Sequence, residues 1–450
     1  MPNSVCFNTD YPGIAKSDEL YARATGLIPA YSQVIAKGPT QYVNGVAPKY
    51  LQRGKGSHVW DVDGNEYIDL NSGVGPISLG YCYERVDEAI KRQLEDGITL
   101  SLVHPLEVEV AELVREVIPN AESVRFGKTG AGVTSAAVRL ARAYTGRDHV
   151  LCCGYHGWHD WYAGVTVRNE GIPQAVKDLV NTFTYNDLDS VTRSMDGDTA
   201  CVILEPMVFD FPEGGFLENL KQFCEENGTL LVFDEMWTGF RLAVGGAQEY
   251  FGVVPHLACY SKAIANGMPI SVITGRREIL DLVNHDVWFT TTFGGEMLSL
   301  AAAAATINEI RERDVPAYLV RQGQKLRDGT NRIAAELGID GHTRCKGHPA
   351  RTLVTFDVSA GDPLLLKSLV QQEMIKRGVL WSGFHNVNFS HTDEDIAYIL
   401  DAYRDVLPIL KRAVEGGTVV QSLRGEPVQP ISRPTADFDV KPRAGAAVRR

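Results

Sequence analysis

Residues 124–146 read VRFGKTGAGVTSAAVRLARAYTG, and this stretch decides the fold class. A short apolar run leads into the turn TGAG at residues 129–132, and a helical pattern of small and apolar residues follows at once. A strand, a glycine-rich turn and a helix in this order are typical of α/β proteins, where amides at the start of the helix can face an anion. The stretch therefore predicts an α/β sheet with a phosphate-binding turn. The alternative, which this turn alone leaves open, is a tight connection without a ligand.

The same alternation extends through the middle of the chain. Apolar runs of strand length lie at residues 149–153, 199–206, 229–235, 256–261 and 270–275. Helical patterns occupy residues 105–118, 215–228 and 298–314. Strands that alternate with helices form a mostly parallel sheet. We therefore predict a large α/β domain over residues 71–310.

The two ends of the chain have a different pattern. Residues 51–70 alternate apolar and polar residues on both sides of an Asp-Gly pair, which predicts a β-hairpin within an N-terminal arm, residues 1–70. Residues 311–425 contain another strand and long helices. We predict that the arm and this C-terminal region form a smaller α+β domain, and that the Pro-rich residues 426–450 form a flexible tail.

The composition limits the possible partners and compartment. The chain has 450 residues and a formal net charge of -12, from 44 Lys+Arg and 56 Asp+Glu, which argues against nucleic acid and anionic membranes as partners. Its eight cysteines lack the spacing of a zinc knuckle, and no window is long and apolar enough to span a membrane. We expect a cytoplasmic protein without a membrane or nucleic-acid partner.

Ionisable residues stand at the ends of three apolar runs. Glu205 ends one run, Asp234 and Glu235 end the next, and Lys262 ends a third. Ligands of open α/β sheets bind just beyond the carboxyl ends of the strands. An amine that forms a Schiff base with an aldehyde, and a carboxylate that pairs with a protonated ring nitrogen, are what pyridoxal phosphate requires. The alternative is a plain salt bridge between Asp234 and Lys262.

Two other segments offer ligand-binding residues. The segment 289–298 contains Thr292 before two glycines and a helix. This pattern indicates that the hydroxyl of Thr292 either contacts a phosphate or caps the helix. The segment 154–164 offers Tyr155 for stacking on a flat ring and the pair His156 and His159. These two histidines have only Asp160 beside them, which is too few ligands for a metal site. We therefore predict no metal.

Seven segments in this order resemble the class III, fold type I aminotransferases. The segments are residues 60–70, 124–146, 154–164, 202–206, 230–241, 260–271 and 291–303. The resemblance covers about residues 25–410. Within this class the chain is most similar to the glutamate-1-semialdehyde 2,1-aminomutase group, particularly to members associated with amine formation in surface polysaccharides or secondary metabolites.

The resemblance implies the cofactor pyridoxal 5'-phosphate and a role for each matching residue. Lys262 is the Schiff-base lysine and moves protons, and Asp234 keeps the pyridine nitrogen protonated. Met236 and Tyr155 lie on the two faces of the ring. Glu205 lies near the phenolic side of the cofactor or the incoming amine.

The phosphate site implied by the resemblance belongs to two subunits. Thr129, Gly130 and Ala131 bind the phosphate in one subunit, and Thr292 reaches it from the neighbouring one. The resemblance therefore implies a homodimer with shared active sites.

Two departures from the family pattern bear on the reaction. The phosphate turn reads Thr-Gly-Ala-Gly, where the family has Ser-Gly-Thr and an acid. We therefore expect phosphate binding to depend more on backbone amides. Residues 31–48 lack the arginine with which aminomutases hold the substrate carboxylate, and Lys37 offers only a point charge. Arg351 is a candidate for binding a donor carboxylate, or it caps a strand at the surface.

The sequence therefore predicts an aminotransferase that moves an amino group from an amino acid donor to a carbonyl acceptor in a biosynthetic pathway. A glutamate-1-semialdehyde 2,1-aminomutase type of isomerase is one alternative. A non-catalytic binding scaffold is another, although a scaffold has no use for both Lys262 and Asp234.

Overall fold

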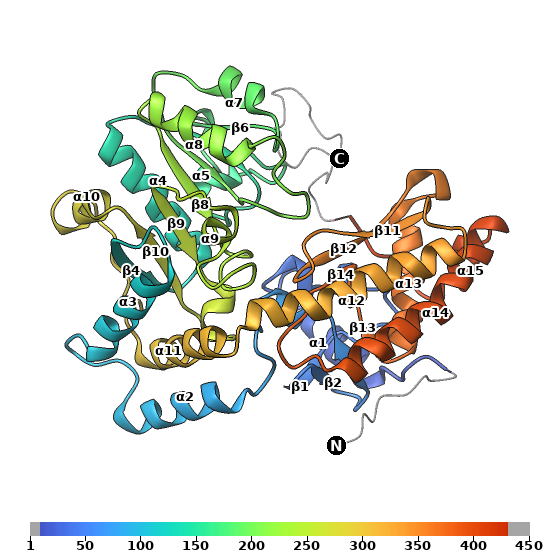
Figure 1. Ribbon diagram of the computed structural model, residues 1–450. Helices are drawn as coiled ribbons and strands as arrows, with labels where there is room; N and C mark the ends of the chain where they lie inside the picture. Colours follow the sequence, from blue (N-terminus) through green and yellow to red (C-terminus); the bar gives the residue numbers. More distant parts are fainter. Residues whose placement is uncertain (1–9, 431–450) are drawn as a thin grey trace. The chain divides into compact units, whose positions relative to one another are not determined.

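The computed structural model describes residues 10–430, which form two compact units (Figure 1). One unit consists of residues 84–314, and the other combines residues 10–83 with residues 315–430. We call them the large unit and the small unit. Of the predicted tail, residues 431–450 lie outside the described residues, as do residues 1–9 of the predicted arm.

The large unit is built on a seven-stranded sheet, in the order β4-β10-β9-β8-β7-β5-β6. Its strands are β4 (Ser123–Gly127), β5 (His149–Cys153), β6 (Val180–Thr182), β7 (Thr199–Leu204), β8 (Leu230–Asp234), β9 (Leu257–Tyr260) and β10 (Ser271–Gly275). Strand β10 is antiparallel to both of its neighbours, and the other six strands run in one direction. The predicted mostly parallel α/β sheet is confirmed.

Helices cover this sheet because the central strands are mostly apolar. Every residue of β7, β8 and β9 is buried. The helices are α2 (Glu84–Asp96), α3 (Pro105–Val117), α4 (Gly130–Thr145), α5 (Asp160–Ala163), α6 (Gln174–Asp178), α7 (Leu188–Ser194), α8 (Phe216–Glu226), α9 (Ala247–Phe251), α10 (Arg277–Leu280) and α11 (Met297–Glu312). Small and apolar side chains of α4 pack on β7, β9 and β10, and α11 packs on α2, α3 and the 3-10 helix η4 (Lys262–Ala265).

The small unit contains two sheets and long helices. One sheet has the order β1 (Leu51–Lys55), β2 (His58–Asp61), β3 (Glu66–Asp69) and β13 (Val379–Leu380), and the other β11 (Thr343–Lys346), β12 (Thr352–Phe356) and β14 (Phe384–His385). The predicted hairpin is confirmed: β2 and β3 are antiparallel, and Gly64 in their turn has a φ of 97°. The helices are α1 (Ala15–Ala24), α12 (Val315–Glu336), α13 (Pro363–Lys376), α14 (Asp393–Glu415) and α15 (Val419–Ser422). Within residues 10–430, no helix is both long and apolar enough to cross a membrane.

The patterns in the sequence did not indicate α2 and α12. Helix α2 buries a single residue, Val86, and most of its residues are charged or polar. Both helices begin where the chain passes from one unit to the other, at residues 84 and 315.

Candidate active site

Five parallel strands place the candidate residues on one edge of the large sheet. Strands β4, β5, β7, β8 and β9 run in the same direction, so their carboxyl ends meet at the same edge. The residues that follow or end them are Thr129, Tyr155, Glu205, Asp234 and Lys262. The edge where ligands of α/β sheets bind therefore holds an amine, two carboxylates and a helix start.

Asp234 is the last residue of β8 and is 1% exposed. Its Oδ2 lies 2.8 Å from Nδ1 of His156, and its Oδ1 accepts a hydrogen bond of 3.1 Å from the amide of Met236. A carboxylate has about four positions for donors, so it retains capacity for one more partner. Within the described chain its partners are His156 and Met236, and the alternative of a salt bridge to Lys262 is not observed.

His156 is a site residue to which sequence reasoning gave no role. Its side chain is fully buried, with the ring stacked on Trp161 at an interplanar angle of 13°. Its Nε2 lies 3.1 Å from the carbonyl of Cys153. A carbonyl only accepts, so Nε2 is the donor in this contact, and Nδ1 faces Oδ2 of Asp234. The signal that could have revealed it is its position directly after the strand 149–153, beside Tyr155.

Lys262 begins η4 immediately after β9 and has a φ of 47°. A residue other than glycine in this region costs about 1–3 kcal/mol, so the surrounding structure must hold it there. The neighbouring Ser261 contributes, because its hydroxyl donates a 2.6 Å hydrogen bond to the carbonyl of Ile270. The Nζ of Lys262 lies over the ring of Trp237, 3.7 Å from its centroid.

The turn before α4 has the form of an anion cradle. Thr129 is the N-cap of the helix, and its hydroxyl accepts a 3.1 Å hydrogen bond from the amide of Gly132. A Cβ at Gly130 would lie 2.9 Å from Sδ of Met236, so a larger residue would displace this side chain. In the same way, a Cβ at Gly157 would lie 2.5 Å from Cβ of Ala131. The turn therefore contacts both Met236 and the loop that carries Tyr155 and His156.

Glu205 and Tyr155 are joined through the backbone. Glu205 is 6% exposed, and its Oε1 accepts a 2.9 Å hydrogen bond from the amide of Tyr155. Tyr155 itself is 45% exposed, and its ring meets Tyr162 edge to face at 5.6 Å. Its exposed ring surface is compatible with stacking on a flat ligand.

Glu235, next to Asp234, anchors the turn that follows β8. It is fully buried, and burial raises its pKa to about 7, although Thr238 and the amides of Ala247 and Gln248 donate hydrogen bonds to it. These bonds fix the segment 235–239 at the active edge.

Three predicted residues stand apart from this group. Thr292 is exposed, in a turn before α11, and its hydroxyl bonds to no residue of the described chain. Lys37 and Arg351 belong to the small unit, where Lys37 ends a 3-10 helix and the amide of Arg351 donates to the carbonyl of His348. Their roles stay predictions.

The residues at the active edge fit pyridoxal phosphate. Asp234 has acceptor capacity for a ring nitrogen, and Lys262 offers the amine for the aldehyde. The turn at the start of α4 suits the phosphate, and Met236 packs against this turn. Among residues 10–430, no three His, Cys, Asp or Glu side chains are grouped in a way that could hold a metal ion.

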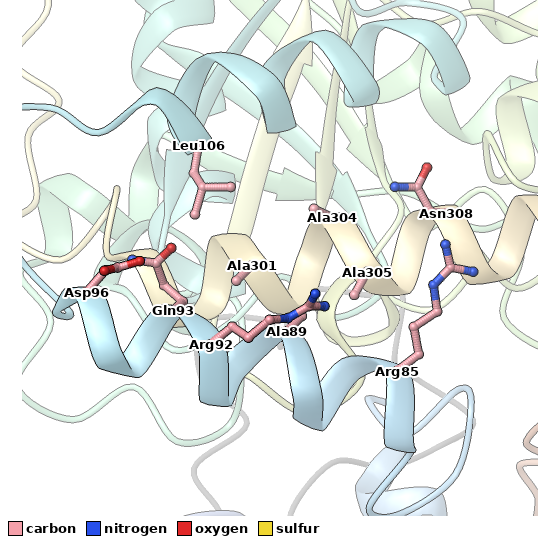
Figure 2. A pocket seen from close by; sticks show the side chains of 10 residues that line it. All are labelled: Arg85, Ala89, Arg92, Gln93, Asp96, Leu106, Ala301, Ala304, Ala305 and Asn308. Atoms are coloured by element: carbon pink, nitrogen blue, oxygen red, sulfur yellow. The ribbon is translucent and has the colours of Figure 1, made fainter.

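A separate pocket of about 360 Å³ lies between α2, α3 and α11 (Figure 2). Alanines of α11 form its floor, and Arg85, Arg92 and Asp96 of α2 stand at its side. Arg85 is engaged with Glu309 at 2.6 Å and with Glu312 at 2.6 Å. None of the candidate active-site residues lines this pocket.

Comparison with known proteins identifies the family. Residues 42–389 match the family described as "Aminotransferase class-III". The chain belongs to this family, and the predicted membership is confirmed.

Relatives with two kinds of name are similar to this chain. It is 34% identical to a 3-aminobutyryl-CoA aminotransferase of Cloacimonas acidaminovorans, over 89% of this chain and 98% of that protein. It is 35% identical to glutamate-1-semialdehyde 2,1-aminomutase 2 of Halalkalibacterium halodurans, over 81% of this chain and 92% of the relative.

Solved structures show the same fold. The FumI protein of Sphingopyxis sp. MTA144, in a form with pyridoxal phosphate, has a TM-score of 0.83 and 28% identity, over 89% of this chain and 98% of that one. An omega-transaminase of Sphaerobacter thermophilus has a TM-score of 0.79 and 25% identity, over 89% and 98%. The predicted fold type I architecture is confirmed.

Proposed function

We propose that this protein is a pyridoxal-phosphate-dependent aminotransferase that moves an amino group from an amino acid donor to a carbonyl acceptor. Its family membership makes it an enzyme of this cofactor class. The observation that carries the proposal is that Asp234 ends β8 and Lys262 follows the end of β9, the adjacent parallel strand, in which Cys259 pairs in register with Asp234. The amine and the carboxylate thus face one ligand from two neighbouring strands.

Each residue of the edge has a task in this proposal. When bound, pyridoxal phosphate supplies a conjugated ring that takes up the electron pair released at the donor's Cα. Asp234 holds the proton on the ring nitrogen, and His156 fixes the orientation of Asp234. Lys262 anchors the cofactor and moves the proton from Cα.

The remaining residues of the edge orient the cofactor. Thr129, Gly130 and Ala131 hold the phosphate. Met236 and Tyr155 lie against the ring, and Glu205 limits which amine fits.

The arm of the small unit favours transfer over isomerisation. Lys37 is the only cationic residue among residues 31–48 and is exposed. A planar guanidinium binds a carboxylate with two parallel hydrogen bonds, which an ammonium cannot do. We therefore expect poor conversion of glutamate 1-semialdehyde to 5-aminolevulinate. The aminomutase type remains the second candidate, supported by relatives with that name.

A half-reaction tests the proposal. An amino donor, with glutamate tried first, is added to the protein without an acceptor, and the absorbance change from the pyridoxal to the pyridoxamine form is followed. Borohydride is expected to trap the cofactor on Lys262, and Lys262→Ala to lose more than about 10⁴-fold in rate. Lys91→Ala, which changes an exposed lysine of α2, serves as control. Undiminished turnover in Lys262→Ala would exclude this mechanism. Efficient conversion of the semialdehyde without a donor would favour the aminomutase.

We also propose a homodimer with shared sites, located in the cytoplasm. The surface near Thr292 supports the dimer. Leu102, Val103, Trp288 and Phe293 are 57–85% exposed, an unusual accumulation of large apolar side chains. Their segments adjoin, because a Cβ at Gly295 would lie 2.4 Å from Glu107. Thr292→Val is expected to weaken cofactor retention by about 1.5–3 kcal/mol. Sedimentation that shows an active monomer would contradict the shared site.

A further inference from the structure

The indole of Trp237 lies against the amine of Lys262, and the proposed function gives it no task. The Nζ of Lys262 is 3.7 Å from the centroid of the ring. The negative face of an aromatic ring attracts an ammonium ion, whereas a neutral amine gains little from it. The contact therefore discriminates between the two protonation states of the lysine.

The turn that carries Trp237 packs against the end of β9, the strand that precedes Lys262. Trp237 lies in the turn 235–239, whose ends are joined by a 2.9 Å hydrogen bond from the amide of Gly239 to the carbonyl of Glu235. A Cβ at Gly239 would lie 2.4 Å from the ring of Tyr260, which precedes Lys262 by two residues. The turn is therefore packed directly on the end of β9.

The lysine side of the contact is fixed as well. Lys262 has a φ of 47°, and Ser261 is bonded to the carbonyl of Ile270 at 2.6 Å. The helix η4, which Lys262 begins, packs on α11. Both backbones are held, so the contact depends on the side chains of Lys262 and Trp237 alone.

We propose that Trp237 is a positioning residue that stabilises the protonated form of Lys262 during proton transfer. The inference rests on the proposed function, in which Lys262 removes a proton from the donor's Cα. The Cα–H bond breaks, its electron pair stays with the conjugated ligand, and an N–H bond forms, so the neutral amine becomes an ammonium. The ammonium then returns the proton to a neighbouring carbon. The indole is unchanged throughout.

The size of the effect follows from the interaction. Cation–π contacts favour the charged form by a factor of about 2 to 30, from exposed to desolvated positions. Trp237 is half-buried. Removing the ring should therefore change the ratio of ammonium to amine by a factor within this range.

The experiment measures the protonation of Lys262 directly. The full-length protein is loaded with pyridoxamine 5'-phosphate, which leaves the Lys262 amine unlinked, and is trace-labelled with acetic anhydride from pH 6 to 11. Mass spectrometry of the Lys262 peptide gives the midpoint of the titration. In Trp237→Leu the midpoint is expected to fall, so that labelling below the midpoint is about 2- to 30-fold faster than in the wild type.

A matched control is present in the small unit. There the guanidinium of Arg53 lies over the ring of Trp60, 3.8 Å from its centroid. Trp60→Leu removes an equivalent indole far along the chain and should leave the midpoint of Lys262 unchanged. A purely structural role of Trp237 would alter the plateau rate of labelling, which reports access, without moving the midpoint.

The outcomes separate this inference from the proposed function. Borohydride trapping of pyridoxal phosphate on Lys262 in both wild type and Trp237→Leu would support the function, and an unchanged midpoint in that variant would then overturn the role of Trp237 alone. Failure of trapping in the wild type would overturn both. If Trp237→Leu does not fold, Trp237→Phe carries the test. Its weaker ring should lower the midpoint by less, and an unchanged midpoint there overturns the inference.

Discussion

Two histidine–aspartate pairs, one in each unit, show how the same chemistry serves different ends. In the large unit His156 meets Asp234 at 2.8 Å, and in the small unit His58 meets Asp395 at 3.1 Å. Asp395 also accepts hydrogen bonds from Ser57 and from the amide of Thr392, in the capping box of α14. His58 has a second carboxylate, Glu66, at 2.8 Å.

The difference lies in what each carboxylate has left to bind. Asp395 is occupied by a histidine, a hydroxyl and an amide, so it joins β2 to α14 and is a structural group. Asp234 is held by one histidine and one amide and stands at the end of a parallel strand. A buried carboxylate that is oriented but not saturated is suited to receive a ligand.

The largest expected contrast comes from changing each aspartate to asparagine. Asp234→Asn should lower turnover by about 10²–10³-fold, because an amide cannot stabilise the proton on the ring nitrogen by its charge. Asp395→Asn should leave turnover per folded molecule unchanged and lower the free energy of unfolding by about 1–3 kcal/mol. Steady-state kinetics and urea unfolding of both variants measure the contrast. Near-wild-type turnover of Asp234→Asn would contradict the expected difference between the two aspartates.

A smaller contrast is expected from the histidines. His156→Phe keeps a ring against Trp161 but removes the hydrogen bond to Asp234, so cofactor affinity should fall by about 10- to 100-fold. His58→Phe should retain the cofactor as well as the wild type does. Dialysis against buffers without cofactor, followed by absorbance, compares the two. If both variants lost cofactor equally, His156 would have no special role in holding Asp234.

The smallest effect concerns the pH dependence of stability. Burial of His58 opposes its charge, but the hydrogen bonds and charges of Asp395 and Glu66 outweigh burial and raise its pKa. The nearby His391 has a pKa lowered to about 4 by burial, so it stays neutral above pH 5.

The raised pKa of His58 sets the direction of this dependence. Its stabilising contribution should be fully present below the unfolded pKa of about 6.5 and lost as pH rises through the folded pKa. Urea unfolding of wild type and His58→Phe from pH 5 to 8 should show a difference that shrinks with rising pH. A difference that grows with pH would mean that His58 is held neutral.

Much of the large unit could be predicted from the sequence because its signals are local. The strand runs 149–153 and 229–235 are apolar and short, and the helix that follows Thr129 begins at a capping residue. Lys262 and Asp234 could be placed because each ends such a run. Helix α2 could not, since most of its residues are charged or polar and Val86 alone is buried.

The residues missed at the site depend on contacts between distant segments. The sequence argues against His156 as a metal ligand, because Asp160 is the one acid beside it, and its partner Asp234 lies 78 positions along the chain. Trp237 stands within a segment used to identify the family, but its contact with Lys262 requires the pairing of β8 with β9. Local patterns show which residues end strands, whereas the sheet order decides which of them meet.

The antiparallel strand β10 has a consequence for how the protein folds. It lies between β4 and β9: Ser271 pairs with Gly127, which precedes the turn at Thr129, and Val272 pairs with Tyr260, which precedes Lys262 by two residues. When β10 pairs with β4, the chain between Gly127 and Ser271 is closed into a long loop. Closing it is slow, because the chain loses conformational entropy before the strand contacts form. We therefore expect the amine and the phosphate turn to come together when β10 pairs with β4, in a late step of folding. Added pyridoxal phosphate should then bind in the last kinetic phase of refolding, and its colour would report completion of the sheet.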